Sequence, residues 1–253
     1  MMTKLDILSA SYNDTKDQEF HYAVLPWGAT EPHNYHLPYL TDCYLAHDIA
    51  ADAVRKAYDN KQVKGMMLPP IPLGAQNPGQ LDLPFCLHTR YETQKAILTD
   101  IVASLHRQGI FRLIIVNGHG GNNFKNMIRD LAVDYPFFLI AVSDWFSIVP
   151  QEGYFEEDDD HAGELETSVL MHYRPELVNL SVAGDGTYYP FRSEALREGV
   201  AWIPRNWSKI SDDTGVGNPH KSTPEKGARY ADVVTDKLAD LFDQLVNGDI
   251  YAR

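Results

Sequence analysis

The chain has 253 residues, a hydrophobic fraction of 44% and a net charge of −13, from 22 basic and 35 acidic residues. This composition is that of an ordinary globular protein, and we expect residues 1–253 to form a single domain. The negative charge would repel a phosphate backbone, and no apolar run approaches the roughly 20 residues that span a membrane, so neither nucleic acid nor a membrane is an expected partner. Two cysteines, Cys43 and Cys86, are too few for a disulfide framework, which predicts a cytoplasmic protein.

Short apolar runs alternate along the chain with longer amphipathic stretches. The runs at 22–26, 66–69, 113–117 and 137–143 are typical of buried strands. Apolar residues recur at helical spacing in 42–58, 93–108, 123–133, 164–173 and 224–246. This alternation predicts a mostly parallel sheet that is covered on both faces. The stretch 183–219 has no clear period and is expected to be a long loop region over an opening or a subunit contact.

Polar clusters follow three of the predicted strands, and sites in such sheets gather at the carboxyl ends of strands. The first cluster contains Glu31, His33, His36 and Asp42. Residues two apart in an extended chain point to the same side, and Asp42 begins a predicted helix, where it could cap the helix and also bind a cation. Mixed histidine and carboxylate ligands suit Zn, Mn or Fe(II) better than Ca or Mg. For each residue alone, the alternative is a helix cap or an ordinary loop histidine.

The second cluster, at 117–123, is a glycine-rich turn that contains His119 and precedes a predicted helix. Such a turn could bind phosphate, but it lacks both the GxGxxG order and a P-loop lysine. A histidine among glycines is better explained as a metal ligand held in a tight turn. The backbone N–H groups of Gly120, Gly121 and Asn122 could receive an oxyanion.

The third cluster, at 160–168, begins with Asp160 and His161 just before a predicted helix. Glu164 and Glu166 lie near the start of that helix, where capping and the helix dipole are the alternative explanation for them. The acidic run 156–160 by itself indicates a solvated loop. There is no GxSxG motif and neither cysteine has a nucleophile's surroundings, so we expect a metal-activated water rather than covalent catalysis.

Four motifs in this order resemble the signature of the creatininase (creatinine amidohydrolase) family. They lie at 27–33 with 36–38 and 41–42, at 117–122, at 161–168, and at 214–219 with 225–227. The resemblance implies a three-layer α/β/α fold and a two-metal amidohydrolase site with Zn or Mn and sometimes Fe. It also implies a homo-oligomer, often a hexamer.

By motif position, the resemblance implies that Glu31, Asp42 and His119 hold one metal. His33 and Asp42 would hold the second, with Asp42 bridging the two ions. In creatininase itself, a glutamate two residues after the strand-end histidine completes the second metal site, and this chain has Gly121 at that position. The same departure occurs in branches of the family that open formamides or process a peptide.

Glu166 is our candidate for the missing ligand, because it is the carboxylate on the helix of the third motif; Glu164 and a water are the alternatives. His161 matches the proton-transferring histidine of the family, and Asp160 matches the acidic residue before it. The segment between residues 73 and 89 departs from the family pattern, in which a histidine and a Gly-Thr pair are usual, and it is expected to contribute to the substrate pocket.

The expected function is metal-dependent hydrolysis of a non-peptide C–N bond in a small molecule, either a cyclic amide such as creatinine or a formamide. Two other classes of function stay open. The chain could be a metal-binding or assembly protein of the same fold that has lost catalysis, which the glycine at position 121 motivates. A nucleotide-binding domain that uses the turn at 118–121 is the third hypothesis.

Overall fold

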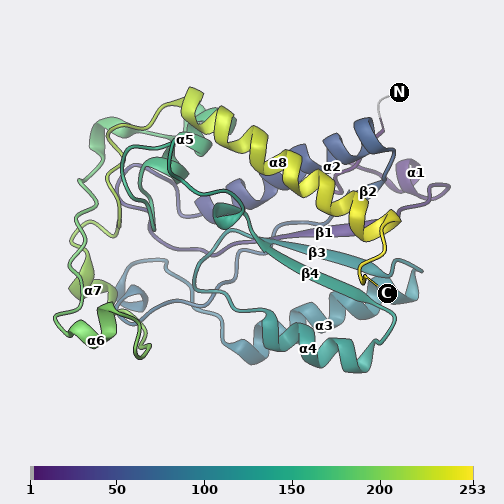
Figure 1. The fold of residues 1–253 in the computed structure, drawn as a ribbon, viewed down its shortest axis with the longest axis horizontal. Helices are drawn as coiled ribbons and strands as arrows, with labels where there is room; N and C mark the ends of the chain where they lie inside the picture. Colours follow the sequence, from purple (N-terminus) through teal and green to yellow (C-terminus); the bar gives the residue numbers. More distant parts are fainter. Residues whose placement is uncertain (1–2, 253) are drawn as a thin grey trace.

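The computed structural model describes residues 3–252, in which a four-stranded parallel sheet forms the middle layer (Figure 1). The strands are β1 (Tyr22–Trp27), β2 (Gly65–Met67), β3 (Arg112–Asn117) and β4 (Leu139–Asp144), in the spatial order β2-β1-β3-β4. Parallel strands need crossover connections, and the amphipathic stretches between the strands provide them as helices. The predicted parallel sheet is confirmed.

Helices cover both faces of this sheet and complete three layers. One face carries α2 (Thr41–Lys61), α5 (Glu164–Tyr173) and α8 (Pro224–Asn247), and the other carries α3 (Tyr91–Arg107) and α4 (Lys125–Asp134) (Figure 1). The side chains of β1 alternate between the two resulting cores, as strand geometry requires. Tyr22 and Val24 pack with α2 and α8, whereas Ala23 and Leu25 pack with α3 and α4. The predicted α/β/α fold is therefore confirmed.

The remaining elements are short. They are α1 (Tyr12–Thr15), α6 (Glu194–Arg197), α7 (Trp207–Ile210), and the 3₁₀ turns η1 (Gln80–Asp82), η2 (Trp145–Ser147), η3 (Pro175–Leu177) and η4 (Leu180–Val182). The stretch 183–219 thus contains only single turns of helix in a long loop, as expected. None of the helices among residues 3–252 is long and apolar enough to cross a membrane.

Several predicted boundaries differ from the structure by a few residues. The predicted strand 137–143 starts only at Leu139, because the amide of Phe138 closes a turn onto the carbonyl of Tyr135 and the Phe137 side chain is 90% exposed. The predicted helix 123–133 starts at Lys125, which leaves the glycine turn and the residues after it in an irregular loop. Apolar residues in a sharp turn have the composition of a strand without its pairing, so composition alone misplaces the boundary.

Three strands end at the same level of the sheet, and this alignment positions the functional site. Trp27 pairs with Asn117, and Asn117 pairs with Asp144, so the segments that follow β1, β3 and β4 leave from one edge. The turn after β3 also packs tightly against the start of α2. A Cβ atom at Gly118 would lie 2.3 Å from the carbonyl oxygen of Asp42, so only glycine permits this approach.

Candidate metal centre

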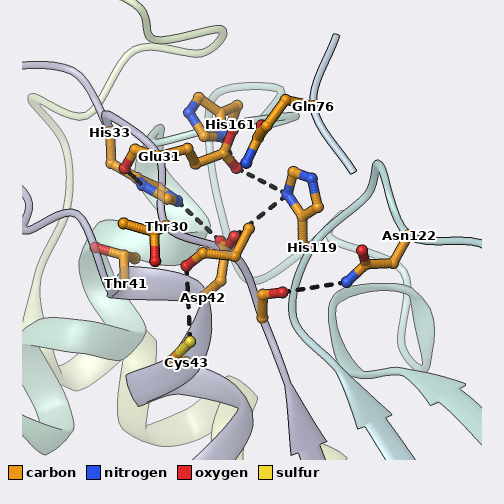
Figure 2. Close-up of polar contacts among 12 residues, drawn as sticks. Thr30, Glu31, His33, Thr41, Asp42, Cys43, Gln76, His119, Asn122 and His161 are labelled. Atoms are coloured by element: carbon orange, nitrogen blue, oxygen red, sulfur yellow. Dashed lines mark hydrogen bonds and ion pairs between the residues drawn. The ribbon is translucent and has the colours of Figure 1, made fainter. Parts of the chain in front are cut away.

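Buried carboxylates and imidazoles meet where the segments after β1 and β3 approach the first turn of α2 (Figure 2). Oε1 of Glu31 lies 2.8 Å from Nδ1 of His119, and Oδ2 of Asp42 lies 3.3 Å from the same nitrogen. One potential ligand atom from each of these residues lies within 4.8 Å of the other two. The three side chains come from three separate segments, as the motifs predicted for the first metal site.

A second group of potential ligands shares Asp42 with the first. It contains His33, Asp42 and Glu166, whose ligand atoms also lie within 4.8 Å of one another. Oδ1 of Asp42 is 2.9 Å from Nε2 of His33, whereas Oδ2 faces His119. Because its two carboxylate oxygens face different groups, Asp42 has the geometry of a bridging ligand. Glu166 therefore lies beside His33 and Asp42, where it could serve as the further ligand that the sequence left open.

Glu164, the alternative to Glu166, is engaged elsewhere. Its Oε2 accepts hydrogen bonds of 2.8 Å from the amides of Glu156 and Glu157. Its Oε1 forms an ion pair with Nζ of Lys226. Glu164 therefore holds the acidic loop and the start of α8 against α5, and it does not reach the cluster.

Asp42 does not cap α2, contrary to one interpretation of the sequence. The helix begins at Thr41, its N-cap residue is Leu40, and no side chain caps it. The Asp42 carboxylate instead faces the two imidazoles, and it is 1% exposed. Burial by itself would raise the pKa of Asp42, but the charge of His33, the hydrogen bond with His33 and the nearby imidazole of His119 hold that pKa well below its usual range.

Backbone carbonyls determine which nitrogen of each histidine faces the cluster. Nε2 of His119 donates to the carbonyl of Ala75 at 2.7 Å, and Nδ1 of His33 donates to the carbonyl of Glu31 at 3.0 Å. A carbonyl oxygen can only accept, so these nitrogens carry the protons. The other nitrogen of each ring faces the carboxylates, which is the usual arrangement of metal-ligating histidines.

The pKa values of these groups show that the cluster favours positive charge. Burial opposes the charged form of His33, but the Asp42 carboxylate outweighs burial and raises the pKa of His33 to about 10. Burial opposes the charge of His119 in the same way, and the Glu31 carboxylate raises its pKa well above the usual range. Burial raises the pKa of Glu166 to about 8. In the metal-free protein, protons bound to His33, His119 and Glu166 thus compensate the negative charge of the carboxylates.

These residues fit divalent cations. The three carboxyl groups of Glu31, Asp42 and Glu166 are buried beside two inward-facing ring nitrogens. Oδ2 of Asp42 is buried and has no hydrogen-bond partner among residues 3–252. A buried carboxylate oxygen is costly unless a charge or a donor compensates it. The mixture of imidazole and carboxylate donors suits Zn, Mn or Fe(II).

Protons and cations compete for this cluster, which predicts how metal-free stability changes with pH. A histidine with a raised pKa contributes stability that is complete below its unfolded pKa of about 6.5 and is lost as the pH rises through the folded pKa. Carboxyl groups with raised pKa values, such as Glu166, change stability in the same direction above pH ~4.5. We expect the metal-free protein to lose stability as the pH rises from ~6.5 to ~8. The lowered pKa values of Glu31 and Asp42 affect stability only at more acidic pH.

Metal binding must release these protons, so the gain in melting temperature on adding Mn²⁺ should increase with pH. Thermal unfolding at pH 5.5 and pH 8, each with EDTA and with excess Mn²⁺, measures this gain. A gain that is constant or smaller at pH 8 would show that the imidazoles of His33 and His119 are not ligands.

His161 lies beside the cluster, and with Glu31 and His33 it forms a third group of potential ligands whose atoms lie within 4.8 Å of one another. Its ring centroid is 4.3 Å from that of His33, and its Nδ1 is 3.8 Å from Oε1 of Glu31. Nε2 donates to the carbonyl of Pro32 at 2.9 Å, so Nδ1 is the unprotonated nitrogen of the neutral ring. Burial, followed by the charge of His33, lowers the pKa of His161. The ring is therefore neutral at neutral pH and Nδ1 can accept a proton.

Asp160 lies further out than His161. Its side chain is 52% exposed and forms an ion pair with Arg205, whose guanidinium lies 5.0 Å from the ring centroid of Trp207. Asp160 lines a cavity that it shares with His119 and His161, but it is not a member of the groups of potential metal ligands found among residues 3–252. Its pairing with Arg205 joins the third motif to the long loop 183–219.

Asp159 shows that the interpretation of 156–160 as a solvated loop is wrong for one residue. Its carboxylate accepts hydrogen bonds from the amides of Gly163, Leu165 and Glu166 at 3.0, 2.6 and 3.1 Å. It therefore satisfies the open amides at the start of α5, the helix that carries Glu166. Burial of this carboxyl group raises its pKa to about 6. An acidic residue four positions before a Gly-Glu helix start is the sequence signal that could have shown this.

His36 and Gln80 lie near the cluster and form hydrogen bonds that hold its segments in place. Nε2 of His36 lies 2.8 Å from Oγ1 of Thr167, and burial lowers the pKa of His36 to about 4, so this histidine is neutral and holds the loop after β1 against α5. The sequence missed Gln80, which is 1% exposed and donates from its amide to Oε2 of Glu31. No local pattern marks Gln80, because it reaches the site from the single turn η1.

The glycine turn after β3 does not favour a nucleotide. The acidic groups around His119 would repel phosphate, and α4 begins only at Lys125. Gly120, Gly121 and Asn122 do line the cavity, as predicted for substrate contacts. The backbone N–H of Asn122, however, donates to the carbonyl of His119, and the Asn122 side chain bonds Gly28 and Ala75. Asn122 therefore braces the turn, and Gly120 and Gly121 are the remaining candidates for an oxyanion donor.

Gly121 cannot hold a side chain in this structure. A Cβ atom there would lie 2.2 Å from the carbonyl oxygen of Ala75 and 2.5 Å from Nε2 of His119. A glutamate side chain at this position could not be accommodated without displacing Ala75 or His119.

The substitution Gly121→Ala should reduce both stability and metal retention. The added methyl group collides with a backbone carbonyl, so we expect a loss of about 1–3 kcal/mol in the free energy of unfolding. Gly120→Ala is the matched control, because a Cβ atom at Gly120 meets no atom within 4 Å and should change neither quantity. Urea unfolding and metal analysis of both variants check this. Equal stability of the two would contradict the packing argument.

A cavity of about 530 Å³ opens onto the cluster, within the range of small-molecule sites. Glu31, His119 and His161 lie at its inner end. Trp202, Pro204, Arg205 and Trp207, all from the loop 183–219, contribute to its wall. The loop 183–219 therefore lies over the opening of this cavity, which is one of the two roles predicted for it from the sequence.

Comparison with known proteins places this chain among the amidohydrolases, and its buried carboxylate–histidine cluster is compatible with such a hydrolase. A family model described as creatininase, creatinine amidohydrolase, matches residues 8–242. The chain belongs to the creatininase family.

Relatives within the family have different named activities. The mycofactocin precursor peptide peptidase of Mycobacterium ulcerans (strain Agy99) is 28% identical over 221 residues, which cover 84% of this chain and 81% of the relative. The creatinine amidohydrolase of Pseudomonas putida is 26% identical over 191 residues, covering 66% of this chain and 71% of that protein.

Solved structures give the same fold. A crystal structure from Bacteroides fragilis NCTC 9343, of a protein provisionally named a creatinine amidohydrolase, has a TM-score of 0.97 and 57% identity and covers 99% of this chain and 100% of that chain. A manganese form of creatininase has a TM-score of 0.77 and 19% identity, covering 96% and 99% of the two chains. At that identity the likeness shows the fold alone.

Proposed function

We propose that this amidohydrolase hydrolyses a non-peptide C–N bond in a small molecule, a cyclic amide or a formamide, with two divalent ions. The observation that carries the proposal is the position of Asp42, whose Oδ1 faces His33 and whose Oδ2 faces His119, so that Asp42 belongs to two of the groups of potential ligands. Glu31, Asp42 and His119 would hold one ion, and His33, Asp42 and Glu166 the other. Related creatininase structures are described as manganese or Zn–Zn forms, which supports Mn or Zn.

Bound divalent ions lower the pKa of water and polarise a carbonyl group. The residues of this chain would then move the protons. Nδ1 of His161 faces the centre and takes a proton from the attacking water, and the resulting imidazolium gives that proton to the departing nitrogen. The hydrogen bond from Nε2 to Pro32 keeps the ring in the tautomer that can do so.

Asp160 is a positioning residue in this proposal. It immediately precedes His161 in the chain. The backbone amides of Asp160 and His161 both donate to the carbonyl of Val216 at 3.0 Å. Its carboxylate pairs with Arg205 of the covering loop. It would hold the loop and His161 in a fixed relation while substrate occupies the cavity.

The size of the cavity supports a small substrate. About 530 Å³ suits a small ring or a short acyl amine, and two tryptophans and a proline from the loop 183–219 narrow it. The relatives named as peptidases cleave a peptide, so peptide cleavage is the alternative that a substrate test must include.

The proposal also includes assembly of the protein into a homo-oligomer.

The experiment is metal analysis of the purified protein followed by a substrate screen. The screen contains lactams, cyclic ureides, creatinine, N-alkylformamides and short peptides, each with Mn²⁺- and Zn²⁺-loaded protein. Turnover of a cyclic amide or a formamide supports the proposal, and turnover of peptides alone contradicts its restriction to non-peptide bonds. Two metal equivalents with no turnover of any compound would identify a metal-binding protein that has lost catalysis.

A further inference from the structure

The carboxamide of Gln76 is buried at the cavity and lacks any protein partner. Gln76 lines the cavity, its Oε1 and Nε2 each expose less than 1 Å² of surface, and neither atom forms a hydrogen bond with any residue in 3–252. Figure 2 shows this side chain between His161 and His119, with its amide end directed toward Glu31. Buried side-chain amides are nearly always hydrogen-bonded, so one with both atoms unpaired requires an explanation.

The backbone around Gln76 is firmly held. The carbonyl of Ala75 accepts a hydrogen bond from Nε2 of His119, and the amide of Ala75 donates to Oδ1 of Asn122 at 3.2 Å. The amide of Gln76 itself donates to Nδ1 of His88 at 2.9 Å. The side chain therefore projects from a segment that is tied to a potential metal ligand, and its position relative to the centre is fixed.

Other glutamines of this region are used by the protein. The amide of Gln80 donates to Glu31, and the amide of Gln94 donates to Asn122 at 3.1 Å. Exchanging the oxygen and nitrogen of Gln76 does not change the argument, because both of its atoms lack a partner. Gln76 thus offers one donor and one acceptor, side by side, to whatever enters the cavity.

We propose that Gln76 is a substrate-binding residue that selects amides whose N–H and C=O lie on the same edge. Its Nε2 donates to the substrate carbonyl while its Oε1 accepts from the substrate N–H, and both contacts form only when the two substrate groups point the same way. Lactams, cyclic ureides and primary amides have this edge. A trans peptide bond or an N-alkylformamide places the N–H opposite the C=O and satisfies only one of the two atoms.

This inference rests on the proposed hydrolysis of an amide C–N bond, and it selects between the substrate classes named there. A merely structural Gln76 would be expected to bond to protein atoms, as Gln80 and Gln94 do.

Binding of small probes to the Zn²⁺-loaded protein tests the inference without requiring turnover. The probes are 2-pyrrolidinone, its N-methyl derivative and the trans amide N-methylacetamide, titrated by ligand-observed NMR. We expect 2-pyrrolidinone to bind at least about tenfold more tightly than either of the others, the effect of one neutral hydrogen bond. Gln76→Met, which keeps the shape and removes both polar atoms, should abolish that preference. Gln108→Met is the matched control on the exposed end of α3 and should retain it.

Equal affinities in the wild type, absence of binding, or a preference that survives in Gln76→Met would each overturn the inference. Thermal unfolding of the ligand-free variants gives a second readout. Because the Gln76 amide has no partner, Gln76→Met should leave the melting temperature unchanged or raise it, whereas a structural glutamine would lower it. The proposed function fails separately, if metal-loaded protein hydrolyses none of the screened amides, so the two failures are distinguishable.

Discussion

Replacing His119 with alanine should abolish metal retention and turnover together. The imidazole of His119 faces both Glu31 and Asp42, at 2.8 and 3.3 Å, and its other nitrogen is anchored to the carbonyl of Ala75. Without His119, the group that it forms with Glu31 and Asp42 would contain only carboxylate ligands. We expect activity to fall by roughly 10³-fold or more, since a bound metal contributes several kcal/mol of transition-state stabilisation.

Metal analysis and turnover of the variant against the wild type measure this effect. His172→Ala removes an exposed histidine at the end of α5 and should change neither quantity. His119→Gln serves as a second variant in case alanine prevents folding, and circular dichroism establishes that both are folded. Retention of metal and activity in a folded His119 variant would remove the ligand assignment on which the proposed mechanism depends.

Replacing Glu166 with glutamine should reduce the metal content from about two ions per chain to about one, with a corresponding loss of activity. Glu166 completes the group of His33 and Asp42, and a neutral amide is a much weaker ligand than a carboxylate. Burial raises the pKa of Glu166 to about 8, so in the metal-free protein the residue is mostly protonated at neutral pH. Glutamine resembles that protonated form, and the metal-free variant should therefore unfold at nearly the wild-type temperature.

Glu164→Gln is the matched control for this prediction. Glu164 lies on the same helix, two residues away, and its carboxylate bonds the amides of Glu156 and Glu157 and the ammonium of Lys226. The control should lose stability, because a buried ion pair is broken, but it should keep both metal ions. If Glu164→Gln loses metal while Glu166→Gln retains it, the two glutamates have been assigned the wrong way round.

Much of the architecture was predictable, because its signals are local. The run 113–117 is continuously apolar, so it could be recognised as a strand that is covered on both sides, and 224–246 has the period of an amphipathic helix. The boundaries were less accurate, as at Phe137, since a turn and a strand can share one composition. The motifs also predicted that Glu31, His33, Asp42 and His119 belong together, and the fold brings them together. Their roles as ligands stay predictions.

Other features of the site depend on distances between segments, which no local pattern contains. The positions of Gln76 and Gln80 follow from how the loop after β2 folds back over His119. The hydrogen bonds that the Asp159 carboxylate accepts, within a run of five acidic residues, follow from its proximity to the start of α5. The periodicity of a sequence indicates which side of a helix or strand is apolar. It does not indicate which polar side chains from other elements will lie near that helix or strand.

The amino-acid sequence by itself determined the order of strands and helices in this protein, the edge of the sheet where polar residues collect, and the residue types that meet there. Only the tertiary structure brought Glu166 rather than Glu164 beside His33 and Asp42, left no space for a side chain at Gly121, and left the amide of Gln76 without a partner among residues 3–252. The physical reason is that element formation depends on neighbours along the chain, whereas coordination and burial depend on atoms that become neighbours only after the crossovers are packed.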